Sequence, residues 1–359
     1  MNNSSSPPFS SPPQAEENEG GNRLELCFIP GDGIGLEVIP AAIEVLRATG
    51  LVFDAVHAEA GWACFQQRGT ALPRKTVELA KHSDAILFGA VSSPSFKVEG
   101  YSSPIVALRR ELALFANLRP SHSWPISSSR PGIDLLIVRE NSEGLYVRRE
   151  RREGDTAIAE RVITRQGSER VIGVACEWAM RRRRHLTVVH KANVLPETCG
   201  LFREAALTVA AGYPDLIVQE MLVDTAAMRL VTHPEAFDVI VTTNLFGDIL
   251  SDEAAGLVGG LGLAPSANVG AARSPALFEP VHGSAPDIAG RGIANPIAAI
   301  LAAAMLLDHF DSCKHAHERA RRVRDAVEHT LRHGPHTPDL GGTATTQDVT
   351  QAIIEKIEK

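Results

Sequence analysis

Short apolar runs alternate with stretches of helical periodicity from residue 23 to the end of the chain. β-Branched and aliphatic residues predict strands at 24–29, 85–91, 133–139, 185–190, 216–221 and 237–241. Apolar residues three and four apart predict helices at 35–48, 105–115, 168–183, 196–211 and 297–310, then a C-terminal pair of which one covers 315–333. Strands that alternate with helices are joined by crossovers, so this order predicts an α/β fold with a largely parallel sheet.

Composition and charge narrow the class of protein. The 359 residues are 44% hydrophobic and 22% charged, as in a globular protein of one large domain or two. Lys and Arg number 36 against 43 Asp and Glu, and the net charge of -7 argues against nucleic acid and anionic membranes as partners. The Ala-rich segment 297–307 is the nearest approach to a membrane span and is too short for one.

The cysteines and the N-terminal segment indicate the cellular compartment of the protein. The five cysteines are scattered without a Cys-x-x-Cys pair, which favours a reducing compartment over a disulfide framework or a thiolate zinc site. Residues 1–22 are rich in Ser, Pro and Glu and contain neither Lys nor Arg, so they resemble neither a signal peptide nor a transit peptide. We expect a disordered tail and a cytoplasmic protein.

A glycine turn follows the first predicted strand. Residues 30–35 read PGDGIG and lead into a helix, as dinucleotide-binding turns do. The spacing is G-x-G-x-G, however, whereas the Rossmann turn requires G-x-G-x-x-G. A Rossmann domain is therefore disfavoured, while a turn that lines a cofactor and a merely structural turn fit equally well.

Two carboxylates form the best candidate for a metal site. Asp248 and Asp252 follow the run 237–241, in a segment that is predicted to turn from loop into helix. Four residues make about one helical turn, so both side chains face the same way. Mg²⁺ and Mn²⁺ prefer such oxygen ligands and keep waters that a substrate can displace. For the motif alone, an acidic first turn that suits the helix dipole is the alternative.

Several arginines indicate a polycarboxylate substrate. They are Arg109 with Arg110 in ALRREL, Arg119 in ANLRP and Arg139 in IVREN. Guanidinium groups bind carboxylates through two parallel hydrogen bonds and keep their charge. Each alone fits a surface ion pair, but Arg119 before a proline and Arg139 at a strand end favour function.

Two further residues and one loop are also candidates for a functional role. Tyr146 is a candidate for proton transfer, as is Lys191 at the carboxyl end of a predicted strand; a solvent lysine is the alternative there. The segment 279–296, EPVHGSAPDIAGRGIANP, contains too much Gly and Pro for one long helix. A long loop inside a compact domain is usually functional.

Together these motifs resemble those of the β-decarboxylating dehydrogenases, which include isocitrate, 3-isopropylmalate, homoisocitrate and tartrate dehydrogenases. The matching segments are IPGDGIGLEV, LRRELALFANLRP, VRENSEGLY, HKANV, VDTAAMRL, TTNLFGDILSDEAAGLVGGLGLAPSANVG and EPVHGSAPDIAGRGIANP. They run from about Leu24 to the C-terminal helix, so the resemblance covers nearly the whole chain after the tail.

The resemblance implies a two-domain, non-Rossmann α/β fold of the isocitrate/isopropylmalate dehydrogenase type. We expect a cofactor-side domain of residues 23–114 plus 259–359. Residues 115–258 are expected to carry the dimer interface with the metal and substrate groups. The Ser-Pro-rich stretch 120–131 and the Gly-rich stretch 256–270 are the expected crossings. A homodimer with shared active sites, or a tetramer, is implied.

The resemblance also assigns roles to the candidate residues. Arg109, Arg119 and Arg139 are expected to hold the malate part of the substrate. Further substrate contacts are expected at Ser102, Ser103 and Asn193. Asp248 and Asp252 are expected to bind Mg²⁺ or Mn²⁺ together with Asp224 of the other subunit. Lys191, also lent across the dimer, is expected to take the hydroxyl proton, and Tyr146 to return a proton to carbon.

The cofactor is predicted to be NAD. Its contacts are expected at Ile34, Ser92, Glu279, His282, Gly283, Ser284, Ala285, Asp287, Ile288 and Asn295. Members of the family that use NADP typically carry Lys and Tyr where this chain has Asp287 and Ile288. A carboxylate accepts hydrogen bonds from ribose hydroxyls but repels a 2′-phosphate.

The substrate prediction is homoisocitrate, oxidised to 2-oxoadipate in lysine biosynthesis. The segments 97–109 and TPDLGGTATT and the turn 92–94 resemble those of homoisocitrate dehydrogenases. Ser102 and Ser103 suit a distal carboxylate, whereas isopropylmalate enzymes typically place a Leu pair there. Isocitrate, 3-isopropylmalate and tartrate or D-malate remain alternative substrates. A non-catalytic regulatory subunit is the hypothesis of another class, and the complete set of site residues disfavours it.

Overall fold

The structure is a computed structural model that describes residues 23–94, 96, 98–271, 274–310 and 315–359. The predicted tail at residues 1–22 lies outside the described residues. Within them, one sheet has the strand order β2-β1-β3-β12-β11-β4-β5-β10-β8-β9. Its strands are β1 (Leu24–Gly31), β2 (Phe53–His57), β3 (Ala85–Ala90), β4 (Ala116–His122), β5 (Asp134–Glu140), β8 (His185–His190), β9 (Ile217–Leu222), β10 (Val239–Thr242), β11 (Pro265–Val269) and β12 (Ala276–Pro280).

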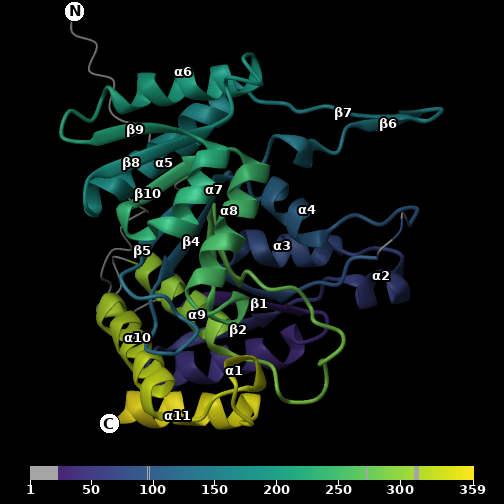
Figure 1. Cartoon of the computed structure of the whole chain (residues 1–359). Coiled ribbons are helices and arrows are strands. Elements are labelled where there is room, and N and C mark those ends of the chain that lie inside the picture. Colours follow the sequence, from purple (N-terminus) through teal and green to yellow (C-terminus); the bar gives the residue numbers. More distant parts are fainter. Residues whose placement is uncertain (1–22, 95, 97, 272–273, 311–314) are drawn as a thin grey trace, which may run out of the picture.

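Helices cover both faces of this sheet (Figure 1). They are α1 (Gly35–Ala48), α2 (Trp62–Arg68), α3 (Arg74–His82), α4 (Pro104–Glu111), α5 (Arg165–Arg181), α6 (Thr198–Ala210), α7 (Val223–Thr232), α8 (Asn244–Leu257), α9 (Ile297–His309), α10 (Ala316–His333) and α11 (Thr346–Glu358). The predicted helix at 35–48 and the predicted strand at 185–190 have the observed bounds. The α/β prediction is confirmed.

Strand β1 shows how the sequence builds the two layers. Leu26 and Phe28 belong to the larger core cluster, which contains the buried face of α1. Cys27 and Ile29 point the other way, into a second cluster with Ala80 of α3 and Leu108 of α4. Successive side chains of a strand alternate between the faces of a sheet, so a strand covered on both faces reads as a continuous apolar run.

The sheet is parallel except at its centre. Strand β11 is antiparallel to both β12 and β4, and β4 is antiparallel to β5. The other paired strands run parallel, which confirms a largely parallel sheet. The strands of the predicted cofactor side, β2, β1, β3, β12 and β11, adjoin one another, and those of segment 115–258 follow. The division into two domains stays a prediction.

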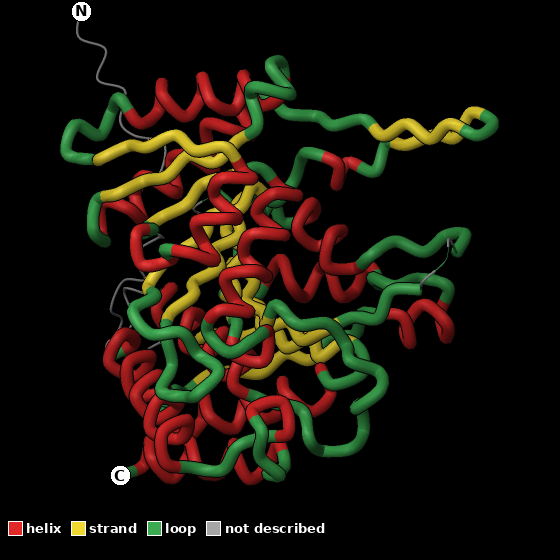
Figure 2. Tube along the Cα trace, viewed as in Figure 1, coloured by secondary structure: helices red, strands yellow, loops and turns green. Residues whose placement is uncertain are grey.

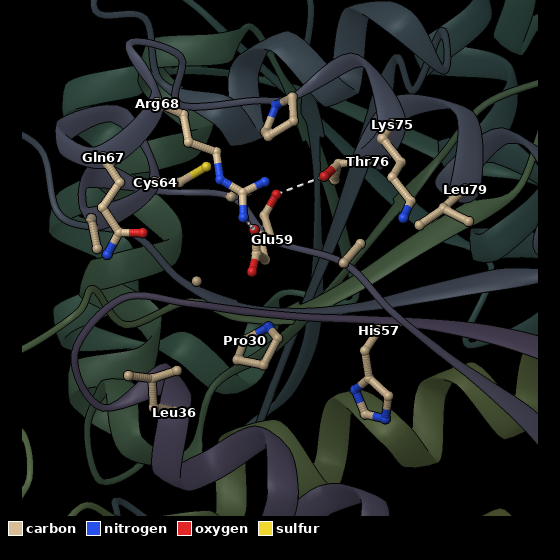
Figure 3. Close-up of a pocket in the computed structure, with 15 residues that line it drawn as sticks. Pro30, Leu36, His57, Glu59, Cys64, Gln67, Arg68, Lys75, Thr76 and Leu79 are labelled. Atoms are coloured by element: carbon tan, nitrogen blue, oxygen red, sulfur yellow. Dashed lines mark hydrogen bonds and ion pairs between the residues drawn. The ribbon is translucent and has the colours of Figure 1, made fainter.

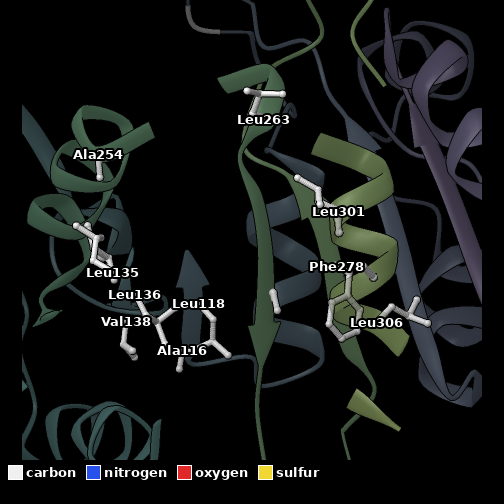
Figure 4. Close-up of a cluster of buried hydrophobic side chains, with 14 of the residues drawn as sticks. Ala116, Leu118, Leu135, Leu136, Val138, Ala254, Leu263, Phe278, Leu301 and Leu306 are labelled. Atoms are coloured by element: carbon white, nitrogen blue, oxygen red, sulfur yellow. The ribbon is translucent and has the colours of Figure 1, made fainter. Parts of the chain in front are cut away.

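Apolar packing is continuous across the junction of β4 and β11. Leu118 of β4 and Val138 of β5 belong to the same core cluster as Phe278 of β12 and Leu301 and Leu306 of α9 (Figure 4). It also includes apolar side chains of α8, so the cluster reaches both faces of the central strands.

Several elements were not predicted from the sequence. Strand β4 contains Arg119 and Pro120, and the predicted crossing at 120–131 begins inside it. A proline lacks the backbone donor that a central strand normally supplies, so this segment does not read as a strand. Strands β11 and β12 fall in the Gly-rich and Pro-rich segments, where the turn residues obscure the short apolar runs.

A hairpin extends from the body of the molecule. Strands β6 (Glu150–Glu153) and β7 (Thr156–Ala159) pair with each other in a separate two-stranded sheet, and their side chains are largely exposed. Figure 2 shows this hairpin reaching away from the other elements. In the part of the chain that the structure describes, no helix is both long enough and apolar enough to cross a membrane.

Candidate active site

Helix α8 carries both predicted metal-binding carboxylates. It begins at Asn244, directly after strand β10, and Asp248 and Asp252 are one turn apart on it. Gly247 faces strand β5: a Cβ atom there would lie 2.7 Å from both Cβ and Cγ of Arg139. The absence of a side chain at Gly247 therefore lets the helix pack directly on Arg139. The predicted turn from loop into helix is confirmed.

Three predicted site residues converge on Asp248. Arg139 of β5 donates from Nη1 to Asp248 Oδ1, and the hydroxyl of Tyr146 donates to Oδ2. Nη1 of Arg119, from β4, lies 3.2 Å from Oδ1 of Asp248 and 3.2 Å from Oδ1 of Asp252. The guanidinium of Arg139 also lies over the Tyr146 ring, 5.1 Å from its centroid. The structure therefore brings these residues together in one cluster.

Polar neighbours fix the two guanidinium groups. Arg139 donates from Nε and Nη2 to Asn244 Oδ1, at 3.1 and 2.7 Å. Arg119 donates from Nη1 to Ser251 Oγ at 2.7 Å. Arg139 is 2% exposed and Arg119 is 7% exposed, so both charges are held almost out of water. Buried guanidinium groups with fixed directions are suited to bind carboxylates.

The two aspartates differ in their electrostatic surroundings. Burial favours the neutral form of Asp248, but the Arg139 and Arg119 guanidinium groups outweigh it and hold the pKa of Asp248 below its usual value. Burial raises the pKa of Asp252, with Arg119 opposing the shift. Burial, together with the hydrogen bond to Asp248, raises the pKa of Tyr146. Tyr146 is thus a protonated donor near neutral pH.

Arg109 reaches the same region from α4. Its Nη2 donates to Glu279 Oε1 at 2.8 Å, and both side chains are buried. Burial lowers the pKa of Arg139, and the charges of Arg119 and Arg109 lower it further, so the three cations lie within electrostatic reach of one another. Arg109 Nε is buried and has no hydrogen-bond partner among the described residues. An unpartnered buried donor is available to a ligand.

Lys191 and Asp224 form a separate pair. Lys191 Nζ donates to Asp224 Oδ1 at 2.7 Å, from the turn after β8 to the first turn of α7. This hydrogen bond lowers the pKa of the exposed Asp224 carboxyl. Asn193 is exposed in the same turn as Lys191. Across the described residues, no three Asp, Glu, His or Cys side chains gather closely enough to hold a metal ion, so Asp224 does not join Asp248 and Asp252 within one chain.

The glycine turn packs against the loop 281–296. Ile34 donates its backbone N–H to the Ser284 carbonyl at 2.9 Å, and Ser92 Oγ donates to Ser284 Oγ at 2.8 Å. A Cβ atom at Gly33, where φ is +57°, would lie 2.1 Å from the Ser284 carbonyl oxygen. The glycine spacing therefore serves close approach of the two loops. The structure thus brings Ile34, Ser92 and Ser284 together, and their contact with a cofactor stays a prediction.

The other predicted cofactor contacts in the loop 281–296 differ in their exposure to solvent. Gly283 and Asp287 are exposed, and Ala285 and Ile288 pack partly against the main core. Ala285 has a φ of +38°, which L residues rarely adopt and which is common at functional loops. His282 Nδ1 lies 2.9 Å from the Gly283 carbonyl, while its buried Nε2 has no partner in the described residues.

Asn295 is already engaged within the chain. Its Oδ1 accepts from the Ile297 N–H at 3.0 Å, and its Nδ2 donates to Asp339 Oδ2 at 3.0 Å. One amide hydrogen is left for a cofactor.

Ser103 is buried at the start of α4, whereas Ser102 is exposed and lines a hollow with residues of α3. The structure does not bring Ser102 to the arginines.

Sequence reasoning missed the polar residues that support the arginines. Asn117 lies on β4, Asn268 on β11, and Asn244 and Ser251 on α8, and all four are buried. A buried asparagine in a strand must find hydrogen-bond partners, so the Asn residues in FANLRP and PSANVG were signals. Their partners depend on the strand order, which the sequence does not reveal.

A pocket of about 570 Å³ lies between the glycine turn and helices α2 and α3. Pro30, Leu36, His57, Arg68 and Lys75 are among its lining residues (Figure 3). None of the predicted site residues lines it. Arg68 and Glu59, which both line it, form an ion pair with each other.

Comparison with known proteins gives close relatives over nearly the whole chain. The family model described as isocitrate/isopropylmalate dehydrogenase matches residues 25–356. The isocitrate/homoisocitrate dehydrogenase of Thermus thermophilus is 57% identical over 334 residues, which cover 93% of this chain and 98% of that protein. The homoisocitrate dehydrogenase of Methanocaldococcus jannaschii is 51% identical over 349 residues, covering 94% and 98%. The crystal structure of isocitrate dehydrogenase from Methylococcus capsulatus superposes with a TM-score of 0.88 at 42% identity, covering 94% of this chain and 100% of that one.

Proposed function

The chain belongs to the isocitrate/isopropylmalate dehydrogenase family of β-decarboxylating dehydrogenases, and on that premise we propose its reaction. It oxidises and decarboxylates a (2R,3S)-2-hydroxy-3-carboxy acid with NAD and a divalent cation. The substrate is a hydroxy-tricarboxylate, homoisocitrate, and the product is 2-oxoadipate. The observation that carries the proposal is the convergence of Arg119, Arg139 and Tyr146 on the carboxylates of α8.

A divalent cation fits the carboxylates of α8. Asp248 and Asp252 present hard oxygen ligands on one helix face, where the arginines now compensate their charge. A cation would take over that compensation and leave Arg119 and Arg139 available to the carboxylates of a substrate. Because Asp224 does not join these two within one chain, its predicted role as third ligand requires a second subunit.

The chain's own groups position the substrate and move its protons. Arg109, Arg119 and Arg139 hold the carboxylates of the malate part. Lys191, from the other subunit, takes the proton of the 2-hydroxyl, and Tyr146, kept protonated by burial, returns a proton to the carbon that loses CO₂. When bound, the cation supplies a Lewis acid at the substrate oxygen and NAD supplies the hydride acceptor.

The loop 281–296 supports NAD as the cofactor. His282 offers a buried ring nitrogen without a partner, and Gly283 leaves open space above the backbone. Asp287 is exposed, as a ligand of two ribose hydroxyls must be. The same carboxylate disfavours a 2′-phosphate. These features support the predicted contacts, and the roles of the individual loop residues are part of the proposal.

Homoisocitrate is preferred over its alternatives for two reasons. The relatives at 57% and 51% identity have homoisocitrate in their names. Ser103 is buried at the start of the helix that carries Arg109, where its hydroxyl can serve a distal carboxylate. Ser102 would need the loop before α4 to move in order to contribute. Isocitrate is the second candidate, because the Thermus relative is named for it as well.

A homodimer with shared active sites is part of the proposal. Val194, Leu195, Met228, Val231 and Ile249 are exposed apolar side chains on or beside α7, α8 and the Lys191 turn. An apolar surface of this kind marks a protein interface. The exposed β6–β7 hairpin offers further unpaired strand edges to a partner. A reducing cytoplasm, lysine biosynthesis and the two-domain division complete the proposal.

One set of assays tests this function. NADH formation is measured with Mg²⁺ and homoisocitrate, isocitrate, 3-isopropylmalate or D-malate, and the values of kcat/KM are compared. Homoisocitrate is expected to give the highest value, and chelation of the cation is expected to stop turnover. A higher value with 3-isopropylmalate would contradict the substrate, and no NADH from any of the four would contradict the function.

A further inference from the structure

A row of buried amides crosses the centre of the sheet. Asn268 of β11 and Asn117 of β4 are 0% exposed and lie opposite each other in the strand register. Asn117 is also opposite Arg139 on the next strand, β5. Directly opposed residues of neighbouring strands project from the same face. The amides therefore extend the arginine side of the active site across the junction between β4 and β11.

The amide of Asn268 uses its full hydrogen-bonding capacity. Its Oδ1 accepts from Asn117 Nδ2 at 2.9 Å and from Asn141 Nδ2 at 2.8 Å. Its Nδ2 donates to the Leu277 carbonyl at 3.2 Å and to Glu279 Oε1 at 2.7 Å. Rotating the amide by half a turn would set donors against donors and acceptors against acceptors. The orientation of Asn268 is therefore fixed.

This network ends at two of the substrate arginines. Asn117 Oδ1 accepts from Arg119 Nε at 2.6 Å, and Glu279 Oε1 accepts from Arg109 Nη2 at 2.8 Å. A continuous path of hydrogen bonds thus runs from Arg119 through Asn117, Asn268 and Glu279 to Arg109. Asn268 is at its middle, where the strands of the two predicted domains meet.

We propose that Asn268 is a positioning residue that holds Arg109 and Arg119 in register across this junction and so sets the affinity for the substrate's carboxylates. Without its amide, Glu279 loses a donor and Asn117 loses the acceptor that orients it toward Arg119. The two guanidinium groups then no longer have fixed directions. The identity of the substrate rests on the function proposed above, but the positioning does not.

The first test replaces Asn268 by leucine, which has a similar size and no hydrogen-bonding atoms. The KM for homoisocitrate is expected to rise about tenfold or more, while the KM for NAD changes less than about twofold. Asn141→Leu is the matched control, because its side chain bonds to Asn268 and to the Leu114 carbonyl rather than to an arginine or Glu279. It is expected to lower Tm comparably and leave the KM for homoisocitrate unchanged.

A second variant gives a signature that a structural role would not produce. In Asn268→Asp, a protonated carboxyl can donate to Glu279 as the amide does, whereas an ionised one repels Glu279 and attracts Arg109. The KM for homoisocitrate is therefore expected to rise with pH in this variant and not in the wild type. Because aspartate is isosteric with asparagine, this arm remains usable where the leucine variant does not fold.

The outcomes separate the two proposals. If Asn268→Leu matches Asn141→Leu in both KM values and Asn268→Asp follows the wild-type pH profile, Asn268 is structural and the inference is wrong. If the wild type turns over none of the four acids, the function fails, and calorimetric binding of citrate and homoisocitrate to the wild type and Asn268→Leu then tests the positioning. Equal affinities, or no binding to either protein, would overturn it.

Discussion

At the scale of single residues, Asp248 combines a predicted role with observed contacts. It is a predicted metal ligand, and it also accepts hydrogen bonds from Arg139 and Tyr146. Asp248→Asn removes a ligand charge without changing shape, so kcat/KM is expected to fall by about a hundredfold or more, with Mn²⁺ affinity measured by calorimetry falling in parallel. Asp308→Asn is the control, since that carboxylate is paired with Arg324 away from the site. Normal turnover of Asp248→Asn at saturating Mg²⁺ would remove the residue from the metal site.

The choice between NAD and NADP is expected to depend on one exposed carboxylate. Asp287 is expected to make NAD preferred over NADP, because a 2′-phosphate would face a like charge. Each tenfold of preference needs only about 1.4 kcal/mol, which a partly desolvated charge contact can provide. The double variant Asp287→Lys with Ile288→Tyr is expected to shift kcat/KM toward NADP. An unchanged ratio of the two cofactors in that variant would show that other residues decide the choice.

The predicted site residues that the structure brings together share one property. Arg119, Arg139 and Asp248 place a charge within or directly after an apolar run, and that contrast is visible without knowing the fold. Asn117 and Asn268 carry no such contrast, because an amide in a strand is intelligible only once its partners are known. Those partners meet because β11 is inserted between β12 and β4. The sequence does not reveal this strand order, so it could not predict that Asn117 and Asn268 belong to the site region.

At the scale of elements, α8 depends on the lack of a side chain at Gly247. A methyl group there would meet Cβ and Cγ of Arg139 at 2.7 Å, so Gly247→Ala is expected to cost about 1–3 kcal/mol of unfolding free energy and to raise the KM for the substrate. Gly256→Ala is the control in the same helix, where an added Cβ meets nothing within 4 Å. It is expected to stabilise by about 0.5–1 kcal/mol. Urea titrations measure both, and equal effects would refute this packing argument.

The helices and strands that the sequence predicts have a clear apolar pattern, and those that it misses do not. Helix α1 has its predicted bounds because its helical spacing of apolar residues holds over its whole length, and strand β8 has them because all its residues but the first form one continuous buried run. Arg119 and Pro120 interrupt the apolar pattern of strand β4, and Arg119 contacts the carboxylates of α8. Helices α2 and α3 are short and follow loop residues, and the short helix α7 begins directly after strand β9 without a turn to mark its start. The sequence thus predicts the elements that build the core and obscures several that build the cleft.

At the scale of the whole molecule, the structure separates two pairs of functional groups. Lys191 pairs with Asp224, and Tyr146 pairs with Asp248. Among the described residues, no hydrogen bond or ion pair joins one pair to the other. A cleft that needs a lysine base and a tyrosine acid on one substrate must therefore assemble from two chains, or one chain must rearrange.

Subunit mixing decides between these alternatives. Lys191→Met is expected to abolish hydride transfer and preserve NAD binding, and Tyr146→Phe is expected to be inactive in turnover. In a mixed dimer with shared clefts, one cleft contains both intact groups and the other contains neither. Random exchange makes about half of the dimers mixed, so the mixture is expected to recover about a quarter of wild-type activity. Differently tagged chains confirm exchange, and each variant mixed with itself is the control. No recovery after confirmed exchange would mean that Lys191 and Tyr146 serve one cleft from one chain.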